Sequence, residues 1–430
     1  MTRFSLDEIE HRKKKTLQWL ESLRVPEERF RYRFSENSGE SLFTSCFALF
    51  ILDLFRETEN LSKKEKQDWA NHIRSFQRQD DGLFYPDPIH HPDVERAVYQ
   101  VSCFSLSALR ILGEQPKYRL SVVDQWKSPE SVENYLRERG CHLGRSGSGN
   151  KAMFQGLFLI YERELSGNNS LDEALNSWFE FHEKHKNKHG FWGAGAGSLY
   201  YHGLQNAYHQ LVVYEYLGRE YSKIENAARI ASLIQDPWGG FAPTLGGGAC
   251  KDYDAAHFVG LATTKEKELN PEWRKVLLRA AEHALDNGNA DGGFCESVVR
   301  DSGGPMRVLQ ELRFCGSAKR REIFFQRVYA TLKAKTRRNQ KKNRRWVAEA
   351  QYFSESTLWD TWFRWLLVAE VVKITEVESA SMFQFQRGAG IGYFRKSDAD
   401  VAKAALPRTT CGTGETSGSD GGAEREIVER

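Results

Sequence analysis

The residues best suited to chemistry lie in one short stretch, GGGACKDYDAAHF, at residues 246–258. Cys250, Asp252, Asp254 and His257 fall within eight positions there, between three glycines and an apolar run. Two carboxyl groups so close together raise the pKa of one of them, and apolar surroundings raise it further. A carboxylic acid that stays protonated can protonate an alkene or an epoxide, which makes Asp254 the candidate general acid. Asp252 and His257 are its candidate catalytic neighbours, although Asp252 also fits a helix N-cap.

Glycine turns divide the chain at intervals of about fifty residues, a spacing that indicates a structural repeat. The turn glycines are Gly82, Gly140, Gly190, Gly240 and Gly293, in the segments QRQDDGLF (77–84), LRERGCHLG (136–144), KNKHGFWG (186–193), IQDPWGGF (234–241) and GNADGGFCE (288–296). Each turn follows a polar, amphipathic helical segment, such as 64–77 or 170–185.

A second series of segments is apolar nearly all round, which is typical of helices buried on every side. These segments are 41–55, 97–113, 152–162, 206–218, 255–263 and 356–372. The two series together predict an antiparallel helix hairpin, repeated about six times, and no sheet. Closing the hairpins into a ring buries every inner helix, so we predict an all-α (α/α)6 toroid over residues 1–375; an open solenoid is the alternative.

The repeats resemble the Q-x-x-x-G-x-W/F repeats of the terpenoid cyclase and protein prenyltransferase superfamily, in QRQDDGLF and IQDPWGGF above all. The resemblance covers about residues 40–370. It implies a toroid whose inner helices begin around one cavity mouth. The segment Asp252-Tyr253-Asp254-Ala255-Ala256 is similar to the D-x-D-D-T-A motif of class II terpene cyclases, with Ala255 in place of the last Asp. By this resemblance Asp254 is the proton donor of a cyclase that acts on an isoprenoid or polyene and needs no cofactor.

Two alternatives belong to other classes of protein. A resemblance to prenyltransferase beta subunits implies a zinc site, and Cys250, Asp252 and His257 offer sulfur, oxygen and nitrogen ligands, although in an order unlike that family's. Toroids of this kind also bind carbohydrates through aromatic platforms and paired carboxylates. A binding toroid without catalysis is the remaining interpretation.

Further polar and aromatic residues are expected near the mouth. The candidate substrate-binding residues are Tyr253, His209, Asn206, Phe241, Trp192, Trp359 and Asp360. The stretch CHLGRSGSGNKAMF (141–154) fits either a phosphate cradle with Arg145 and Lys151 or a flexible turn.

Composition indicates which partners and which cellular location to expect. A net charge of +3 over 430 residues does not favour nucleic acid as a partner. The seven scattered cysteines, and the lack of a secretory signal or a long apolar run, predict a cytoplasmic protein. The basic insert at about 296–350 fits a solvated charged segment, a diphosphate flap or a peripheral membrane contact. Residues 376–430 are expected to form a C-terminal extension that is disordered over 408–430, and the sequence identifies no protein partner.

Overall fold

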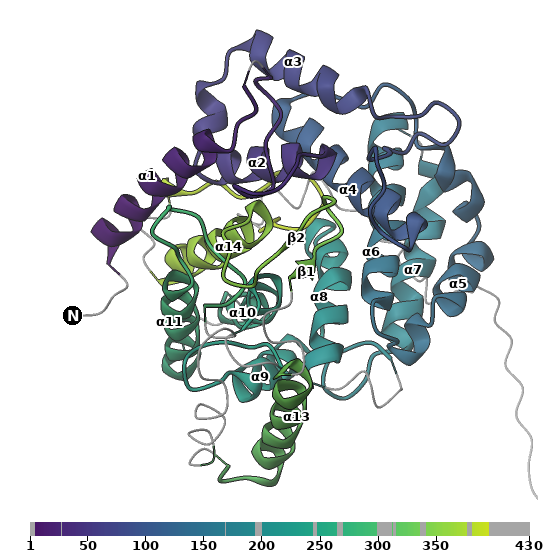
Figure 1. The fold of residues 1–430 in the computed structure, drawn as a ribbon. Helices are drawn as coiled ribbons and strands as arrows, with labels where there is room; N and C mark the ends of the chain where they lie inside the picture. The colour runs from purple at the N-terminus through teal and green to yellow at the C-terminus, as the bar shows by residue number, and fades with distance from the viewer. Residues whose placement is uncertain are drawn as a thin grey trace, which may run out of the picture.

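The computed structural model describes residues 5–26, 28–167, 169–193, 200–243, 247–264, 270–298, 312, 315–335, 341–375 and 381–394. Inner helices alternate along the chain with outer ones and surround a common centre (Figure 1). The inner helices are α2 (Leu42–Leu54), α4 (Val94–Leu112), α6 (Ser148–Ser166), α8 (Tyr200–Tyr216), α10 (Ala249–Thr263) and α14 (Leu358–Thr375). Each contacts the next, and α14 contacts both α10 and α2, so the ring is closed. The predicted toroid is confirmed.

The outer helices cover the ring with one apolar face each. They are α1 (Leu6–Ser22), α3 (Lys63–Arg74), α5 (Pro129–Glu138), α7 (Asp172–Lys184), α9 (Ile224–Ile234) and α11 (Pro271–Asp286). In α3, for example, Trp69, Ala70 and Ile73 are buried while the lysines face solvent. Short 3₁₀ helices η1 (Glu57–Asn60), η2 (Ser121–Trp126), η3 (Cys141–Leu143) and η4 (Asn169–Leu171) connect the hairpins.

Three of the five glycine turns share a backbone bridge. In these turns an isolated antiparallel bridge joins the residues on either side of the turn: Gln77 to Phe84, Lys186 to Trp192, and Gly288 to Phe294. Gly82 and Gly190 have positive φ angles of 76° and 86°, which glycine adopts without strain. The sequence repeat therefore corresponds to a repeated turn that returns the chain from an outer helix to the next inner one.

All inner helices run in the same direction, because contacts between neighbours join like ends. At the amino end of α6, Gly149 N–H donates to Asn206 Oδ1 near the start of α8. At the carboxyl ends, Arg110 of α4 and Tyr216 of α8 both bond to Glu164 of α6. One end of the ring thus collects the amino termini of the inner helices. We call this end the mouth.

The opposite end of the ring is closed by residues 381–394. The Ala389 carbonyl accepts hydrogen bonds from Tyr161 OH of α6 (2.8 Å) and Ser107 Oγ of α4 (3.3 Å). Phe394 packs beside His257 of α10, with ring centroids 5.8 Å apart. Part of the predicted extension is therefore built into the toroid, and the boundary at residue 375 lies too early. The predicted disorder over 408–430 falls outside the described residues.

The insert between α11 and α14 contributes α13 (Ala318–Lys335) and a short antiparallel hairpin of β1 (Lys342–Asn343) and β2 (Ala350–Gln351). The hairpin was not predicted. It lies against the centre of the ring (Figure 1) and buries Arg344 and Val347. Arg327 of α13 is also buried and donates to Tyr201 OH and Ile234 O. The basic run is therefore not a uniformly solvated segment, because some of its arginines are part of the packing.

No helix in the described part of the chain combines the length and apolarity needed to cross a membrane.

Candidate functional site

Helix α10 begins earlier than the sequence indicated, at Ala249 with Gly248 as its N-cap. Asp252 is therefore inside the first turn and is not the N-cap residue. Gly247 before it has a φ angle of 75°, and a Cβ atom there would lie only 2.3 Å from Asp252 Oδ2. The glycines of this stretch thus let the backbone approach the Asp252 carboxylate closely.

Asp252 is fully buried and completely bonded. Its Oδ2 pairs with Arg364 Nη1 of α14 at 2.6 Å and accepts Gly248 N–H at 3.0 Å, while Oδ1 accepts Phe241 N–H at 2.7 Å. Burial opposes its ionisation, but Arg364 and the hydrogen bonds hold the pKa of Asp252 at about 2. Such a carboxylate is permanently charged and has no proton to donate.

Asp254 is also buried but has none of these partners. It is 4% exposed, and its carboxyl group accepts no hydrogen bond and forms no ion pair within the described part of the chain. Burial, together with the charge of Asp252, raises its pKa well above the ordinary value, although His257 and Lys251 oppose this. These surroundings favour the protonated form of Asp254.

His257 lies one turn deeper and joins three inner helices. Its Nε2 lies 2.5 Å from Glu215 Oε2 of α8, and its Nδ1 lies 2.8 Å from Glu370 Oε2 of α14. Burial disfavours the imidazolium, but the two glutamates raise the pKa of His257 well above its usual range. His257 is thus a buried cation clamped between carboxylates, and its electrostatic influence reaches Asp254.

The predicted zinc ligands do not come together. Asp252 faces Arg364, His257 faces Glu215 and Glu370, and burial raises the pKa of Cys250 to about 12, against the thiolate that zinc needs. Within the described ranges, no group of three or more His, Cys, Asp or Glu side chains is arranged to hold a metal ion. The donor set present here does not fit the zinc alternative.

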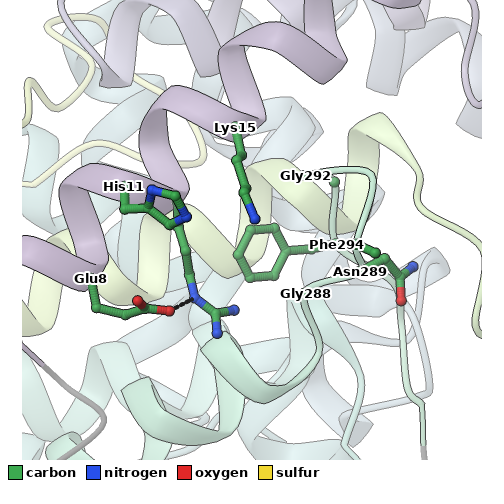
Figure 2. A pocket seen from close by; sticks show the side chains of 10 residues that line it. Glu8, His11, Lys15, Gly288, Asn289, Gly292 and Phe294 are labelled. Atoms are coloured by element: carbon green, nitrogen blue, oxygen red, sulfur yellow. Dashed lines mark hydrogen bonds and ion pairs between the residues drawn. The ribbon is translucent and has the colours of Figure 1, made fainter.

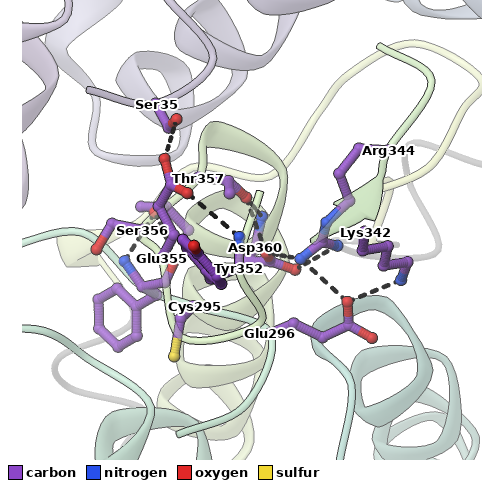
Figure 3. A network of polar contacts seen from close by, with 12 residues as sticks. Ser35, Cys295, Glu296, Lys342, Arg344, Tyr352, Glu355, Ser356, Thr357 and Asp360 are labelled. Atoms are coloured by element: carbon purple, nitrogen blue, oxygen red, sulfur yellow. Dashed lines mark hydrogen bonds and ion pairs between the residues drawn. The ribbon is translucent and has the colours of Figure 1, made fainter. Parts of the chain in front are cut away.

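A chain of charged contacts links α14, the hairpin and the turn after α11 (Figure 3). Arg344 binds Asp360 through both terminal nitrogens, at 3.2 and 2.6 Å, and also reaches Glu296 at 3.0 Å. Lys342 adds a 2.8 Å contact to Glu296. Asp360, expected to bind substrate, is instead tied to Arg344 and Thr357. This network fixes the hairpin over the mouth.

An aromatic group lies under the hairpin. Trp346 packs on Trp359 and Phe43, with ring centroids 5.0 and 4.7 Å apart, and Trp359 packs on Phe47 at 5.2 Å. Trp346 is half-buried and Trp359 is 9% exposed. Aromatic faces of this kind can bind an apolar or cationic group.

His209 and Cys250 are both half-buried. Burial lowers the pKa of His209 to about 4 and raises that of Cys250 to about 12. Of the predicted binding residues, Trp359 lies in the first turn of α14, at the mouth, and packs on Trp346 of the insert. His209 lies midway along α8, with its Nδ1 2.6 Å from Gln205 O.

Four other predicted binding residues hydrogen-bond or pack within the fold. Asn206 Nδ2 donates to Gly144 O and Arg145 O, and its Oδ1 accepts Gly149 N–H. Tyr253 is buried against Tyr208 and Phe363 on the inner wall, and Phe241 is buried behind Asp252. Trp192 packs between α7 and α8 on Tyr214 and Tyr221.

Sequence reasoning missed several residues of the mouth: Arg96, Gln100, Gln205, Arg344, Arg345 and Trp346. A signal for the helical ones exists, because polar residues spaced by four share one face of a helix. Arg96 and Gln100, Gln205 and His209, and Cys250 and Asp254 are such pairs at the amino ends of otherwise apolar helices. No comparable signal marks the hairpin residues within their basic run.

A separate surface pocket of about 270 Å³ lies between α1 and the turn that contains Gly292 (Figure 2). Its lining includes His11, Lys15 and Arg12, and Arg12 is already bound to Glu8 and to Leu285 O. The pocket belongs to the outer surface and contains none of the predicted site residues.

A closed ring of parallel inner helices, sealed at one end and polar at the other, defines an α/α toroid protein. The chain matches the family model described as the prenyltransferase alpha-alpha toroid domain over residues 3–142 and 103–358. These matches span most of the chain, which therefore belongs to the prenyltransferase alpha-alpha toroid domain family.

Comparison with curated proteins gives no match. Among solved structures, a polysaccharide lyase, BACCELL_00875, is similar at 10% identity with a TM-score of 0.45, over 87% of this chain and 98% of that one. A mutant unsaturated glucuronyl hydrolase from Streptococcus agalactiae is similar at 12% identity with a TM-score of 0.29, over 85% and 92%. At these scores neither structure bears on the activity of this chain.

Proposed function

We propose that this toroid is a general-acid enzyme in which Asp254 protonates a substrate held in the mouth. One observation carries the proposal. Asp252 and Asp360 are each paired with an arginine, whereas Asp254 is buried, has no ion pair among the described residues and has a raised pKa that favours its protonated form. An acid kept neutral by its surroundings is a costly arrangement that proton donation would explain.

The chemistry follows the class II terpene cyclase resemblance. The O–H bond of Asp254 breaks as its proton adds to an alkene carbon or an epoxide oxygen of an isoprenoid. The resulting cation is attacked by a second double bond of the same molecule, which forms the ring. The cyclised cation then loses a proton to the Asp254 carboxylate, which yields the neutral product and restores the acid. Trp346 and Trp359 offer ring faces that stabilise the cation.

The test is an incubation of the purified protein with linear isoprenoids and epoxidised polyenes, with the lipid extract analysed by mass spectrometry. Asp254→Asn should lower product formation at least about 100-fold, because it removes the transferable proton. Asp68→Asn, on the outer surface and paired only with Lys64, is the matched control. Product formed equally well by Asp254→Asn would overturn the proposal.

A second candidate is a carbohydrate-active enzyme using the same acid. It is favoured by amide side chains near the mouth, since Gln100 and Asn150 are nine-tenths buried and have no hydrogen-bond partner in the described chain. Amides of this kind suit the hydroxyl groups of a sugar better than a hydrocarbon. Oligosaccharides assayed beside the isoprenoids, with the same two variants, decide between the two substrates.

A further inference from the structure

The sector of the mouth between α4 and α6 contains an arginine that forms no ion pair with a described carboxylate. Arg96 is half-buried, its guanidinium forms no ion pair within the described residues, and its Nε is buried without a hydrogen bond. Burial lowers the pKa of Arg96, Asp93 opposes this, and the charge of Arg345 adds to the lowering. Arg345 is exposed, and its Nη1 lies 3.0 Å from His91 Nε2. The charge of a second guanidinium group thus reaches Arg96.

The acidic residues beside Arg96 are already occupied. Glu95 pairs with Arg139 at 2.8 Å and with Lys151 at 3.3 Å. Asp93 caps α4 by accepting Arg96 N–H and also lies 3.4 Å from Lys151. The sequence suggested Lys151 and Arg145 as the cations of this segment; Lys151 is paired, whereas the guanidinium groups of Arg145 and Arg96 form no ion pair with a described residue.

The amino terminus of α6 lies directly at this guanidinium. Gly147 is its N-cap and supplies no capping side chain, and a Cβ atom at Gly147 would lie 3.7 Å from Arg96 Nη1. The 19-residue helix α6 presents the positive end of its dipole there. A helix start without a capping side chain, beside an unpaired arginine, suits a negatively charged group.

Two buried amides complete the sector. Gln100 lies one turn after Arg96 on the same face of α4 and is 5% exposed. Asn150 lies in the first turn of α6 and is 9% exposed. Neither side chain hydrogen-bonds to another described residue. Both amides are therefore free to hydrogen-bond a bound molecule.

We infer that Arg96, Arg345, Gln100, Asn150 and the amino terminus of α6 form a binding site for an oxyanion, a phosphate or carboxylate group of a small molecule. The anion receives charge-assisted hydrogen bonds from the guanidinium groups and ordinary ones from the amides. The site does not depend on proton donation by Asp254. If both are correct, it anchors the charged group of the substrate at the mouth.

The test is calorimetric titration of the full chain with inorganic phosphate and, separately, with acetate, at constant ionic strength made up with chloride. The wild type should bind at least one of the two anions. Arg96→Gln should weaken that binding at least about tenfold, because it removes a charged hydrogen bond. Arg137→Gln, an exposed arginine of α5 paired only with Glu133, removes the same charge and should bind as the wild type does.

Asn150→Ala is a second variant, with a smaller expected loss, for the case that Arg96→Gln does not fold. Tighter binding of phosphate supports a phosphorylated ligand, and tighter binding of acetate supports a carboxylate. No binding of either anion, or equal weakening by Arg96→Gln and Arg137→Gln, overturns the site. Asp254→Asn should bind the anion normally, so failure of the proposed catalysis and failure of this site give different results.

Discussion

Asp252 and Asp254 are two residues apart on one helix and have opposite environments. Two residues rotate the helix by about 200°, so the side chains point to opposite sides of α10. Asp252 faces the wall toward α14, where Arg364 and two backbone N–H groups meet it, while Asp254 meets no partner among the described residues. One carboxylate fastens the ring and the other is left available for chemistry.

The largest expected effect comes from breaking the ion pair between Asp252 and Arg364. Arg364→Met leaves Asp252 buried with two backbone donors and with His283, whose Nε2 lies 3.5 Å from Asp252 Oδ2. We expect it to lower the free energy of unfolding by about 3–5 kcal/mol, because an uncompensated buried charge is costly. Urea denaturation measures the loss. Arg229→Met, which breaks an exposed i,i+4 pair with Glu225, should change stability by less than about 0.5 kcal/mol.

The double variant Asp252→Asn with Arg364→Met sharpens this measurement. It removes both charges, so it should recover much of the stability lost by Arg364→Met alone. Double-mutant stability equal to the sum of the two single losses would show that the two side chains act independently, and that the ion pair does not fasten the ring.

The clamp at His257 should show a somewhat smaller and pH-dependent effect. His257→Gln removes the cation between Glu215 and Glu370, and we expect a loss of about 2–4 kcal/mol at pH 7. The folded pKa of His257 is raised, so the wild-type contribution is full below the unfolded pKa of about 6.5 and fades as pH rises through the folded value. In the variant the two glutamates must share a proton, which is easier at pH 5.

Denaturation of wild type and His257→Gln at pH 5 and pH 7 therefore tests the clamp. The difference between the two proteins should be larger at pH 7. A difference that is the same at both pH values would mean that His257 contributes packing and not charge.

The difference between the two aspartates also marks how far a single sequence can be interpreted. The toroid followed from glycine turns at regular intervals and from helices that are apolar all round, because each repeat folds by local rules. Asp254, His209 and Trp359 were placed near the mouth because the inner helices begin there. The partners were not visible: Asp252 meets Arg364 and His257 meets Glu370 across more than 100 residues of chain.

The functional residues of the hairpin could not be identified from the sequence either. Arg344 and Trp346 close the mouth, yet in the sequence they lie in a basic run with many similar neighbours. Only the tertiary fold selects Arg344 for the pocket formed by Asp360 and Glu296. The i,i+4 polar pairs at the helix starts, in contrast, were present in the sequence and identify Arg96 and Gln100 by local geometry alone.

The smallest expected effect, and the one that separates the two aspartates most directly, is that of Asp254→Asn on stability. The folded pKa of Asp254 is raised, so at pH above the unfolded value of about 3.9 the unfolded chain gains stability by ionising while the folded chain keeps the proton. Asparagine has no such proton to lose. The variant should therefore be more stable than the wild type at pH 7 by about 1 kcal/mol or more, and equal to it at pH 3.5.

Asp252→Asn should behave in the opposite way, since the folded pKa of Asp252 is lowered: it loses stability at pH 7 and loses less as pH falls toward 2. Melting temperatures of the three proteins across this pH range test the comparison. If Asp254→Asn were less stable than the wild type at pH 7, Asp254 would stabilise the fold as Asp252 does.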